Sequence, residues 1–154
     1  MSNSFALTIY FDASCKLCNS EMQNIKLRDV ENRLTLVDCS APDFDDSPFL
    51  LEGITRDDMM NCLHARNHQG EWIKGVAAFE VIYRSVGMAS IAKLWGHPLT
   101  RPLAERAYPW VVRHRHFLSS IGLHKLFNLW SHHAARQANK RSSQCREGNC
   151  SITR

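Results

Sequence analysis

Two cysteines, Cys15 and Cys18, are the residues of this chain whose type and spacing most directly allow chemistry. They lie three positions apart in the stretch YFDASCKLCNSEM, where an apolar segment gives way to a polar one. A cysteine pair at this spacing can exchange disulfides, supply half of a metal site, or fill space as two buried thiols. The predicted structure around the pair helps to separate these alternatives.

The pair is predicted to lie at the beginning of a helix. Unpaired backbone N–H groups and the positive end of the helix dipole stabilise a thiolate there, so the pKa of a cysteine falls below its free value of about 8.5. An i, i+3 spacing also brings Cys18 within disulfide reach of Cys15. We therefore favour redox chemistry over a metal-binding or structural role. Cys15, expected to be the more exposed, is the predicted nucleophile, and Cys18, on the apolar face of the helix, is the predicted resolving thiol.

Asp12 precedes the pair by three residues, and two roles stay open for it. A carboxylate at this place can accept the proton of Cys18 during exchange. It can also cap the turn between strand and helix, as Asp commonly does. The residue types do not separate these two interpretations.

The other cysteines and the histidines are expected to take no part in the exchange. Cys39 and Cys62 fall in predicted strands, where cysteine is most often a small core residue. Zinc would need a second cysteine pair, and Cys145 and Cys150 supply one only at a looser spacing. These two could relay electrons to the first pair, but we favour the interpretation that they are spare thiols. Solvated positions are expected for the histidines of the basic helical region: His114, His116, His132 and His133.

Length and composition are those of one soluble domain. The chain has 154 residues, with hydrophobic residues at 44% and charged residues at 22%, which suffices for a hydrophobic core without disulfides. No run approaches the roughly 18 apolar residues of a membrane-spanning helix, and the N-terminus lacks the features of a signal peptide. We therefore expect a cytoplasmic location. Structural disulfides are rare there, so the six cysteines favour catalytic or metal-binding roles.

Charge divides the chain into an acidic half and a basic half. Residues 1–83 contain 7 Lys/Arg and 13 Asp/Glu, whereas residues 84–154 contain 12 Lys/Arg and 2 Asp/Glu. The basic half suits weak, salt-sensitive contacts with polyanions, but no nucleic-acid motif accompanies it, and specific nucleic-acid binding is not expected. We favour the interpretation that the two halves attract each other or keep the protein soluble.

The elements that must position the pair follow an α/β order. A buried strand over 5–11 leads into a helix over 14–30, on which four residues can face water: Lys16, Glu21, Lys26 and Arg28. The rest of the core consists of a strand over 33–39, a loop over 40–53, a short helix from Thr55, a hairpin with strands over 62–66 and 71–74, and a helix that ends at Gly87. The order β-α-β-α-β-β-α predicts a compact α/β domain.

The remainder of the chain is predicted to be helical and basic. A helix over 88–96 precedes a longer helical region over 101–141, which Pro109 is expected to kink or divide. Residues 142–154 form a polar tail that we expect to be mobile. The predicted organisation is a single domain over 1–141, with its helical extension from about residue 88, followed by this tail.

Three blocks of the sequence, in this order, resemble one family. YFDASCKLC resembles the D-x-x-C-x-x-C signature of the DCC family of thiol-disulfide oxidoreductases. GEWIKGVAAFEVIYRSVG and PLAERAYPWVVRHR are similar to that family's second block and to its C-terminal helical segment. The resemblance implies a thioredoxin-like fold and a functional trio of Asp12, Cys15 and Cys18.

Two features depart from the pattern of thioredoxin-type enzymes. Such enzymes usually have a cis-proline just before the strand that faces the C-x-x-C, whereas this chain has Met59, Met60 and Asn61 there. Lys16 and Leu17 also stand between the cysteines in place of Gly and Pro. The first departure bears on how a substrate strand would be held, and the second on the redox potential.

The sequence therefore predicts an α/β protein with a thioredoxin-like core and a basic helical C-terminal extension. The predicted activity is thiol-disulfide exchange with thiol or disulfide substrates through Cys15 and Cys18, without a bound cofactor. One alternative is a non-catalytic thioredoxin-like binding module whose basic half docks a partner. Another is a zinc-binding protein that uses Cys15, Cys18, Cys145 and Cys150.

Overall fold

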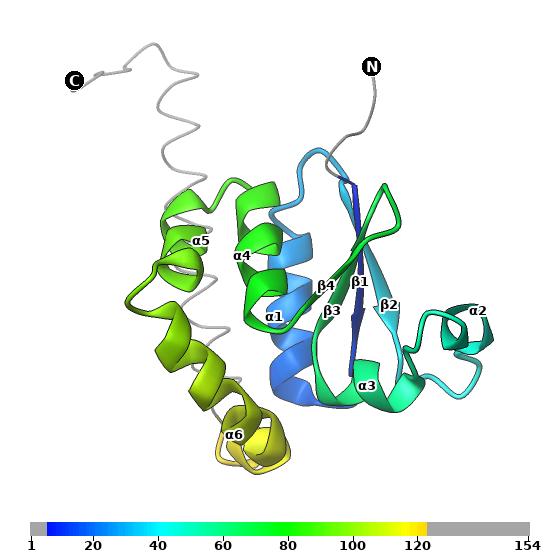
Figure 1. Cartoon of the computed structure of the whole chain (residues 1–154). Helices are drawn as coiled ribbons and strands as arrows, with labels where there is room; N and C mark the ends of the chain where they lie inside the picture. Colours follow the sequence, from blue (N-terminus) through cyan, green and yellow to red (C-terminus); the bar gives the residue numbers. More distant parts are fainter. Residues whose placement is uncertain (1–5, 123–154) are drawn as a thin grey trace, which may run out of the picture.

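The computed structural model describes residues 6–122 (Figure 1). The described elements begin with a β-α-β unit and end with three helices. In chain order they are β1 (Leu7–Phe11), α1 (Lys16–Lys26), β2 (Leu34–Asp38), α2 (Ser47–Leu50), α3 (Arg56–Asn61), β3 (His64–Asn67), β4 (Trp72–Lys74), α4 (Val76–Ser85), α5 (Ala89–Gly96) and α6 (Arg101–Ser120).

The strand β1 lies in the interior of a four-stranded sheet with the order β2-β1-β3-β4. β1 and β2 are parallel, with Ile9 opposite Leu36, and α1 makes the crossover between them. β3 pairs antiparallel with β1, and β4 pairs antiparallel with β3. This βαβ unit followed by a hairpin confirms the predicted α/β class and is consistent with a thioredoxin-like fold.

Successive residues of β1 point to opposite faces of the sheet, and both faces are covered. Ile9 belongs to a large hydrophobic cluster with four buried residues of α1 and α4: Met22, Ile25, Phe79 and Ile82. Tyr10 belongs to a smaller cluster on the other face with Cys39, Ile54 and Met59. Because β1 is buried on both faces, the turn that follows it starts from a fixed position.

The helices α5 and α6 lie outside α1 and α4, on the side away from the sheet (Figure 1). Phe79 of α4 stacks on Trp95 of α5, with ring centroids 5.2 Å apart, and Tyr108 of α6 meets Phe79 edge-on. α6 packs against α1, α4 and α5. The described part of the helical extension is therefore packed onto the α/β core.

The local signals at helix ends are confirmed, with one exception. Thr55 and Asp58 form the predicted capping box, and Gly87 follows α4 with a φ of 77°. Of the two predicted effects of Pro109, a kink or a division of the last helical region, the division is wrong, because α6 is continuous from Arg101 to Ser120. Pro109 is exposed, so water can hydrate the backbone carbonyl that the proline ring leaves without an N–H partner.

Within residues 6–122, the structure contains no helix with the length and apolar character needed to cross a membrane. The predicted tail over 142–154 lies outside the described residues, and so does the end of the predicted domain over 1–141.

Candidate active site

Cys15 and Cys18 come together where β1 passes into α1. Cys15 is the N-cap of α1 and has the extended backbone typical of that position. Its Sγ accepts a hydrogen bond from the backbone N–H of Cys18 over 3.4 Å. The two sulfur atoms lie 2.8 Å apart, with the Cys18 thiol donating to Cys15. A disulfide between them therefore needs little movement of the backbone.

These contacts separate the acidities of the two thiols. The hydrogen bond from the Cys18 thiol lowers the pKa of Cys15 to about 6, against the effect of burial, and the backbone N–H groups of Cys18 and Leu17 lower it further. The same thiol–thiol hydrogen bond, together with burial, raises the pKa of Cys18 far above that of a free thiol. Near neutral pH, Cys15 is therefore the thiolate of the reduced pair and Cys18 is the thiol.

The exposure of the pair is the reverse of the prediction. Cys15 has an exposed fraction of 0%, whereas Cys18 is partly exposed. The expectation that Cys15 is the more accessible sulfur is therefore wrong. An N-cap side chain folds back over the first turn of its helix, and this turns the Cys15 sulfur inward to the N–H of Cys18.

Asp12 is almost fully buried and has partners on both carboxylate oxygens. Oδ1 accepts hydrogen bonds from the backbone N–H and the hydroxyl of Ser14, over 3.0 and 2.5 Å. Oδ2 accepts a hydrogen bond from Arg115 Nη2 over 2.8 Å, and His116 Nε2 lies 3.9 Å from the same oxygen. The contacts with Ser14 are those of a turn cap. The contact with Arg115 is an ion pair that the local sequence does not indicate.

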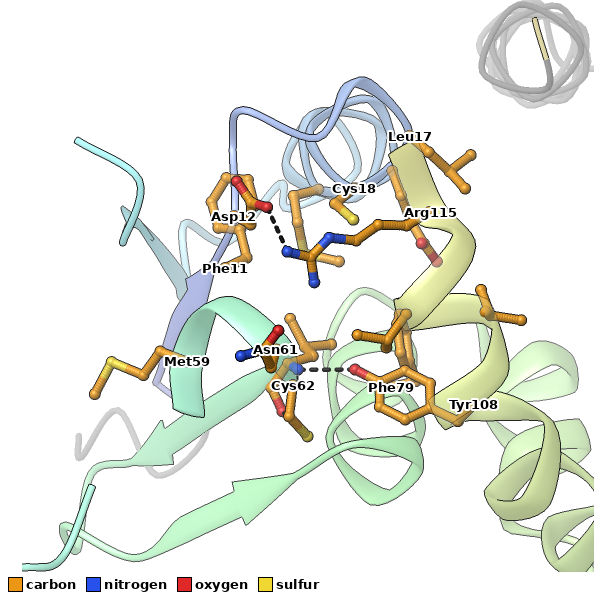
Figure 2. Close-up of a pocket in the computed structure, with 15 residues that line it drawn as sticks. Phe11, Asp12, Leu17, Cys18, Met59, Asn61, Cys62, Phe79, Tyr108 and Arg115 are labelled. Carbon is orange, nitrogen blue, oxygen red and sulfur yellow. Dashed lines mark hydrogen bonds and ion pairs between the residues drawn. The ribbon is translucent and has the colours of Figure 1, made fainter. Parts of the chain in front are cut away.

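Arg115 is a site residue that the sequence interpretation missed. It reaches from α6 to Asp12, and its Nη1 donates to the Met60 carbonyl over 2.6 Å. Its Nε is buried and has no hydrogen-bond partner among residues 6–122. Figure 2 shows the Arg115 side chain extending from α6 toward Asp12, beside Cys18. Its charge also lowers the pKa of Cys15, after the larger effect of the Cys18 hydrogen bond. The one sequence feature that pointed toward such a contact was the attraction expected between the acidic and basic halves of the chain.

A cavity of about 90 Å³ lies beside Cys18, between α1, the segment before β3, and α6 (Figure 2). The charged groups in its wall are Asp12, Glu21 and Arg115. Most of the other lining is apolar and includes Phe11, Leu17, Leu63, Phe79, Val111 and Val112. Cys18, but not Cys15, is part of this lining. The cavity therefore gives access to one sulfur of the pair.

The two remaining described cysteines differ in their surroundings. Cys39 is fully buried, as predicted, and burial raises its pKa to about 12. Cys62 is only partly buried and lines the cavity, so its predicted position in the core is wrong. The reason is that β3 begins at His64, which leaves Cys62 in the segment between α3 and β3.

Glu21 lies one turn after Cys18 on α1 and lines the same cavity. Burial raises the pKa of Glu21 to about 7, against the hydrogen bond that its Oε1 accepts from the Tyr83 hydroxyl over 2.8 Å. The expectation that Glu21 faces water is wrong, because Tyr83 of α4 and the helix α6 cover that side of α1. A carboxyl group that titrates near neutral pH can accept and return a proton beside Cys18.

The segment before β3 is held by side chains of α6. The described residues contain no cis peptide bond, in agreement with the lack of a proline here. The Met60 carbonyl accepts a hydrogen bond from Arg115, and the Leu63 N–H donates to the Tyr108 hydroxyl over 2.8 Å. Figure 2 shows Tyr108 and Arg115 reaching from α6 to the two sides of the cavity.

The remaining candidate ligands do not gather into a metal site in the described part of the chain. The Nδ1 of His114 lies 2.8 Å from the Trp110 carbonyl, its ring stacks on Trp110, and His116 is exposed. No group of three or more His, Cys, Asp or Glu side chains within residues 6–122 could hold a metal ion. Four residues of the alternative interpretations lie outside the described residues: His132, His133, Cys145 and Cys150.

Comparison with known proteins gives a family. Residues 9–120 match the family described as DCC1-like thiol-disulfide oxidoreductase. The chain belongs to this family. The matched residues run from Ile9 of β1, through the cysteine pair, to Ser120 at the end of α6. The resemblance noted in the sequence is therefore confirmed over most of the chain.

One curated relative aligns with part of the chain. An uncharacterized chloroplastic protein of Arabidopsis thaliana is 28% identical over 96 residues. The alignment covers 62% of this DCC1-like chain and 42% of the relative, so the chain spans less than half the length of that protein. No solved structure matches the chain.

Proposed function

We propose that the chain catalyses thiol-disulfide exchange by reversible formation of a disulfide between Cys15 and Cys18. The observation that carries this proposal is the position of Cys15, an N-cap cysteine whose sulfur lies 2.8 Å from a second thiol. Membership of the DCC1-like thiol-disulfide oxidoreductase family supports the same class of reaction.

The difference in acidity gives the pair a preferred direction. The Cys18 hydrogen bonds that lower the pKa of Cys15 stabilise the reduced, dithiol state. A disulfide whose reduced form is stabilised is the more oxidising one. The proposed reaction therefore transfers two electrons from substrate thiols to the Cys15–Cys18 disulfide, which is cleaved, while the substrate sulfurs form a disulfide.

Three further residues are given roles in this proposal. Glu21 accepts and returns the protons that are exchanged at Cys18, since both residues line one cavity and Glu21 titrates near pH 7. Arg115 contributes positive charge near the Cys15 thiolate. Asp12 is a positioning residue, because it holds the turn before Cys15 and neutralises Arg115.

The test is redox titration of the purified full-length chain. The protein is equilibrated in glutathione buffers of different ratio, quenched in acid and alkylated, and the oxidised fraction of each cysteine is measured by peptide mass spectrometry. We expect Cys15 and Cys18 to oxidise together with a single midpoint. Cys39→Ser, which removes a buried thiol away from the pair, is the matched control and keeps this midpoint, whereas Cys15→Ser and Cys18→Ser abolish it.

The same preparation distinguishes the alternatives. A pair that never forms a disulfide, and reacts no faster than free thiols, would support a thioredoxin-like binding module. One zinc ion per chain, released together with reactive thiols on unfolding, would support the zinc-binding alternative. Either result contradicts the proposed exchange reaction.

A further inference from the structure

The way in which a substrate reaches the pair follows from what covers each sulfur. Cys15 is fully buried, while Cys18 is partly exposed and lines the cavity beneath α6. Figure 2 shows the Cys18 side chain facing the side on which Arg115 and α6 lie. A thiol that enters this cavity therefore meets Cys18 first.

The backbone beside the cavity is not free to bind an extended polypeptide. Peptides bind an exposed strand edge by hydrogen bonds to its unpaired N–H and C=O groups. Here the Met60 carbonyl is bound by Arg115, and the Leu63 N–H is bound by the Tyr108 hydroxyl. Both partners belong to α6, so a substrate strand cannot pair at these positions while α6 is packed as observed.

The space that is left suits a small apolar molecule. A second cavity of about 380 Å³, formed with α4, α5 and α6, shares four lining residues with the first: Glu21, Phe79, Tyr108 and Val111. Its other walls are mainly apolar and include Leu94, Trp95 and Leu103. The charge of Arg115 is already neutralised by Asp12, so the described residues offer an anionic ligand no unpaired positive charge in these walls.

We propose that the Cys15–Cys18 disulfide oxidises small, uncharged aliphatic dithiols that bind in these two adjoining cavities, and that Cys18 is the sulfur they attack. This inference rests on the proposed exchange function and names its substrate class. It also reverses the sequence-based prediction that the mixed disulfide forms on Cys15.

The reaction balances in two steps. A substrate thiol loses its proton, and its sulfur attacks Cys18 Sγ, which breaks the Cys15–Cys18 bond and leaves the electron pair on Cys15. The second substrate thiol loses its proton and attacks the first substrate sulfur, which forms a cyclic disulfide and releases Cys18, where a proton is returned. The substrate loses two electrons and two protons. The cysteine pair gains the two electrons and one of the protons, at Cys18, and the other proton passes to the solvent because Cys15 leaves as a thiolate.

The acidities favour attack at Cys18 over attack at Cys15. A thiolate of lower pKa leaves more rapidly in disulfide exchange. Attack on Cys18 expels Cys15, and the backbone N–H groups of Cys18 and Leu17 together with the charge of Arg115 still lower the pKa of this thiol when Cys18 is bonded to the substrate. Attack on Cys15 would expel Cys18, whose pKa is raised by burial. Access and leaving-group ability therefore point to the same sulfur.

The first test locates the mixed disulfide. The oxidised full-length chain is mixed with butanethiol, an uncharged monothiol that cannot complete the second step, then quenched in acid, unfolded and alkylated. Trypsin cleaves after Lys16 and so separates Cys15 from Cys18. We expect the butanethiol adduct on the peptide that begins at Leu17 and contains Cys18. An adduct mainly on Cys15 overturns this inference while leaving the exchange function intact, whereas a chain that reacts with no thiol overturns both.

The second test concerns the substrate class. The rate constant for reduction of the oxidised chain is measured with dihydrolipoamide, an uncharged aliphatic dithiol, and with glutathione. Each rate constant is divided by the rate constant with which the same thiol reduces a small disulfide free in solution. We expect the normalised value for dihydrolipoamide to exceed that for glutathione by about tenfold or more. Val111→Trp, which places a large side chain in the shared wall of the cavities, lowers this preference, and Arg106→Trp, which places the same side chain on the exposed side of α6, does not.

Thermal unfolding shows whether the Val111→Trp variant is folded. If it is not, the smaller change Val111→Leu replaces it in this test. Equal slowing of dihydrolipoamide and glutathione by a folded Val111 variant contradicts the inference. A preference of the parent chain for glutathione, or for a cysteine-containing peptide, also contradicts it.

Discussion

Arg115 Nη2 donates to Asp12 Oδ2 over 2.8 Å, although the two residues lie 103 positions apart in the chain. The exposed fractions of the two side chains are 11% and 2%. This ion pair joins the last described helix to the turn that precedes the cysteine pair. α6 is therefore a part of the candidate site, and substitution of Arg115 or Asp12 should change the stability of the protein.

Arg115→Gln is expected to lower the free energy of unfolding by about 3–5 kcal/mol, because it leaves the buried Asp12 carboxylate without its counter-charge. Urea denaturation measures the change. Arg113→Gln, at an exposed position on the same helix, is the matched control and should have little effect. The double variant with Asp12→Asn should cost less than the sum of the two single changes. Additive effects would show that the ion pair contributes nothing of its own.

The reduced chain should show a thiolate that titrates near pH 6, measured by ultraviolet absorbance. The hydrogen bond from Cys18 lowers the pKa of Cys15 to about 6 from 9.0, so Cys15 is ionised above that pH. A folded-state pKa below the unfolded value contributes stability that is present above pH 9 and is lost as the pH falls through about 6. The titration step should disappear in Cys15→Ser and persist in Cys39→Ser. A parent chain that shows no step near pH 6 that depends on Cys15 would contradict this assignment.

Glu21→Gln should make the protein more stable at pH 8 than the parent chain, by about 2–3 kcal/mol, and equally stable at about pH 4. Burial raises the pKa of Glu21 to about 7 from 4.5, so the folded state favours the protonated carboxyl group. The resulting stability is complete below pH 4.5 and is lost as the pH rises through about 7. Denaturation at several pH values measures the difference. Glu105→Gln, at an exposed position on α6, should show no such pH dependence.

The reduction potential of the Cys15–Cys18 pair should lie above about −270 mV, the value typical of thioredoxin. The reason is the stabilised Cys15 thiolate, which favours the reduced state. Equilibration with glutathione or dithiothreitol buffers gives the potential directly. Arg115→Gln should move it to a more negative value, because the positive charge of Arg115 helps to lower the pKa of Cys15. An unchanged potential in that variant would remove Arg115 from the redox site.

The features that depend on neighbours in sequence could be predicted. The strand Leu7–Phe11, the helix that follows it and the position of Cys15 at its beginning depend on local apolar patterns and local turn residues. The same holds for the capping box at Thr55. The family resemblance rests on short blocks of this kind, and the match over residues 9–120 confirms it.

The features that depend on α6 could not be predicted. Helical periodicity assigned Glu21 to solvent, because the pattern of a single helix does not show which of its faces a later helix covers. Arg115 stood in a basic run of residues, and nothing in that run marks one arginine as the partner of Asp12. The unequal burial of Cys15 and Cys18 likewise depends on how the N-cap side chain folds back, which the spacing alone does not specify.

The long sequence separation of Asp12 and Arg115 also sets an order of events during synthesis. Cys15 and Cys18 leave the ribosome about 100 residues before the arginine that completes their surroundings, which at 5–20 residues per second is roughly 5–20 s. Throughout that interval the nascent chain carries both thiols and the Asp12 carboxylate without the helix that later packs over them. A chain that has not been synthesised past residue 115 therefore carries the cysteine pair and the Asp12 carboxylate without the counter-charge of Arg115 and without the complete wall of the cavity.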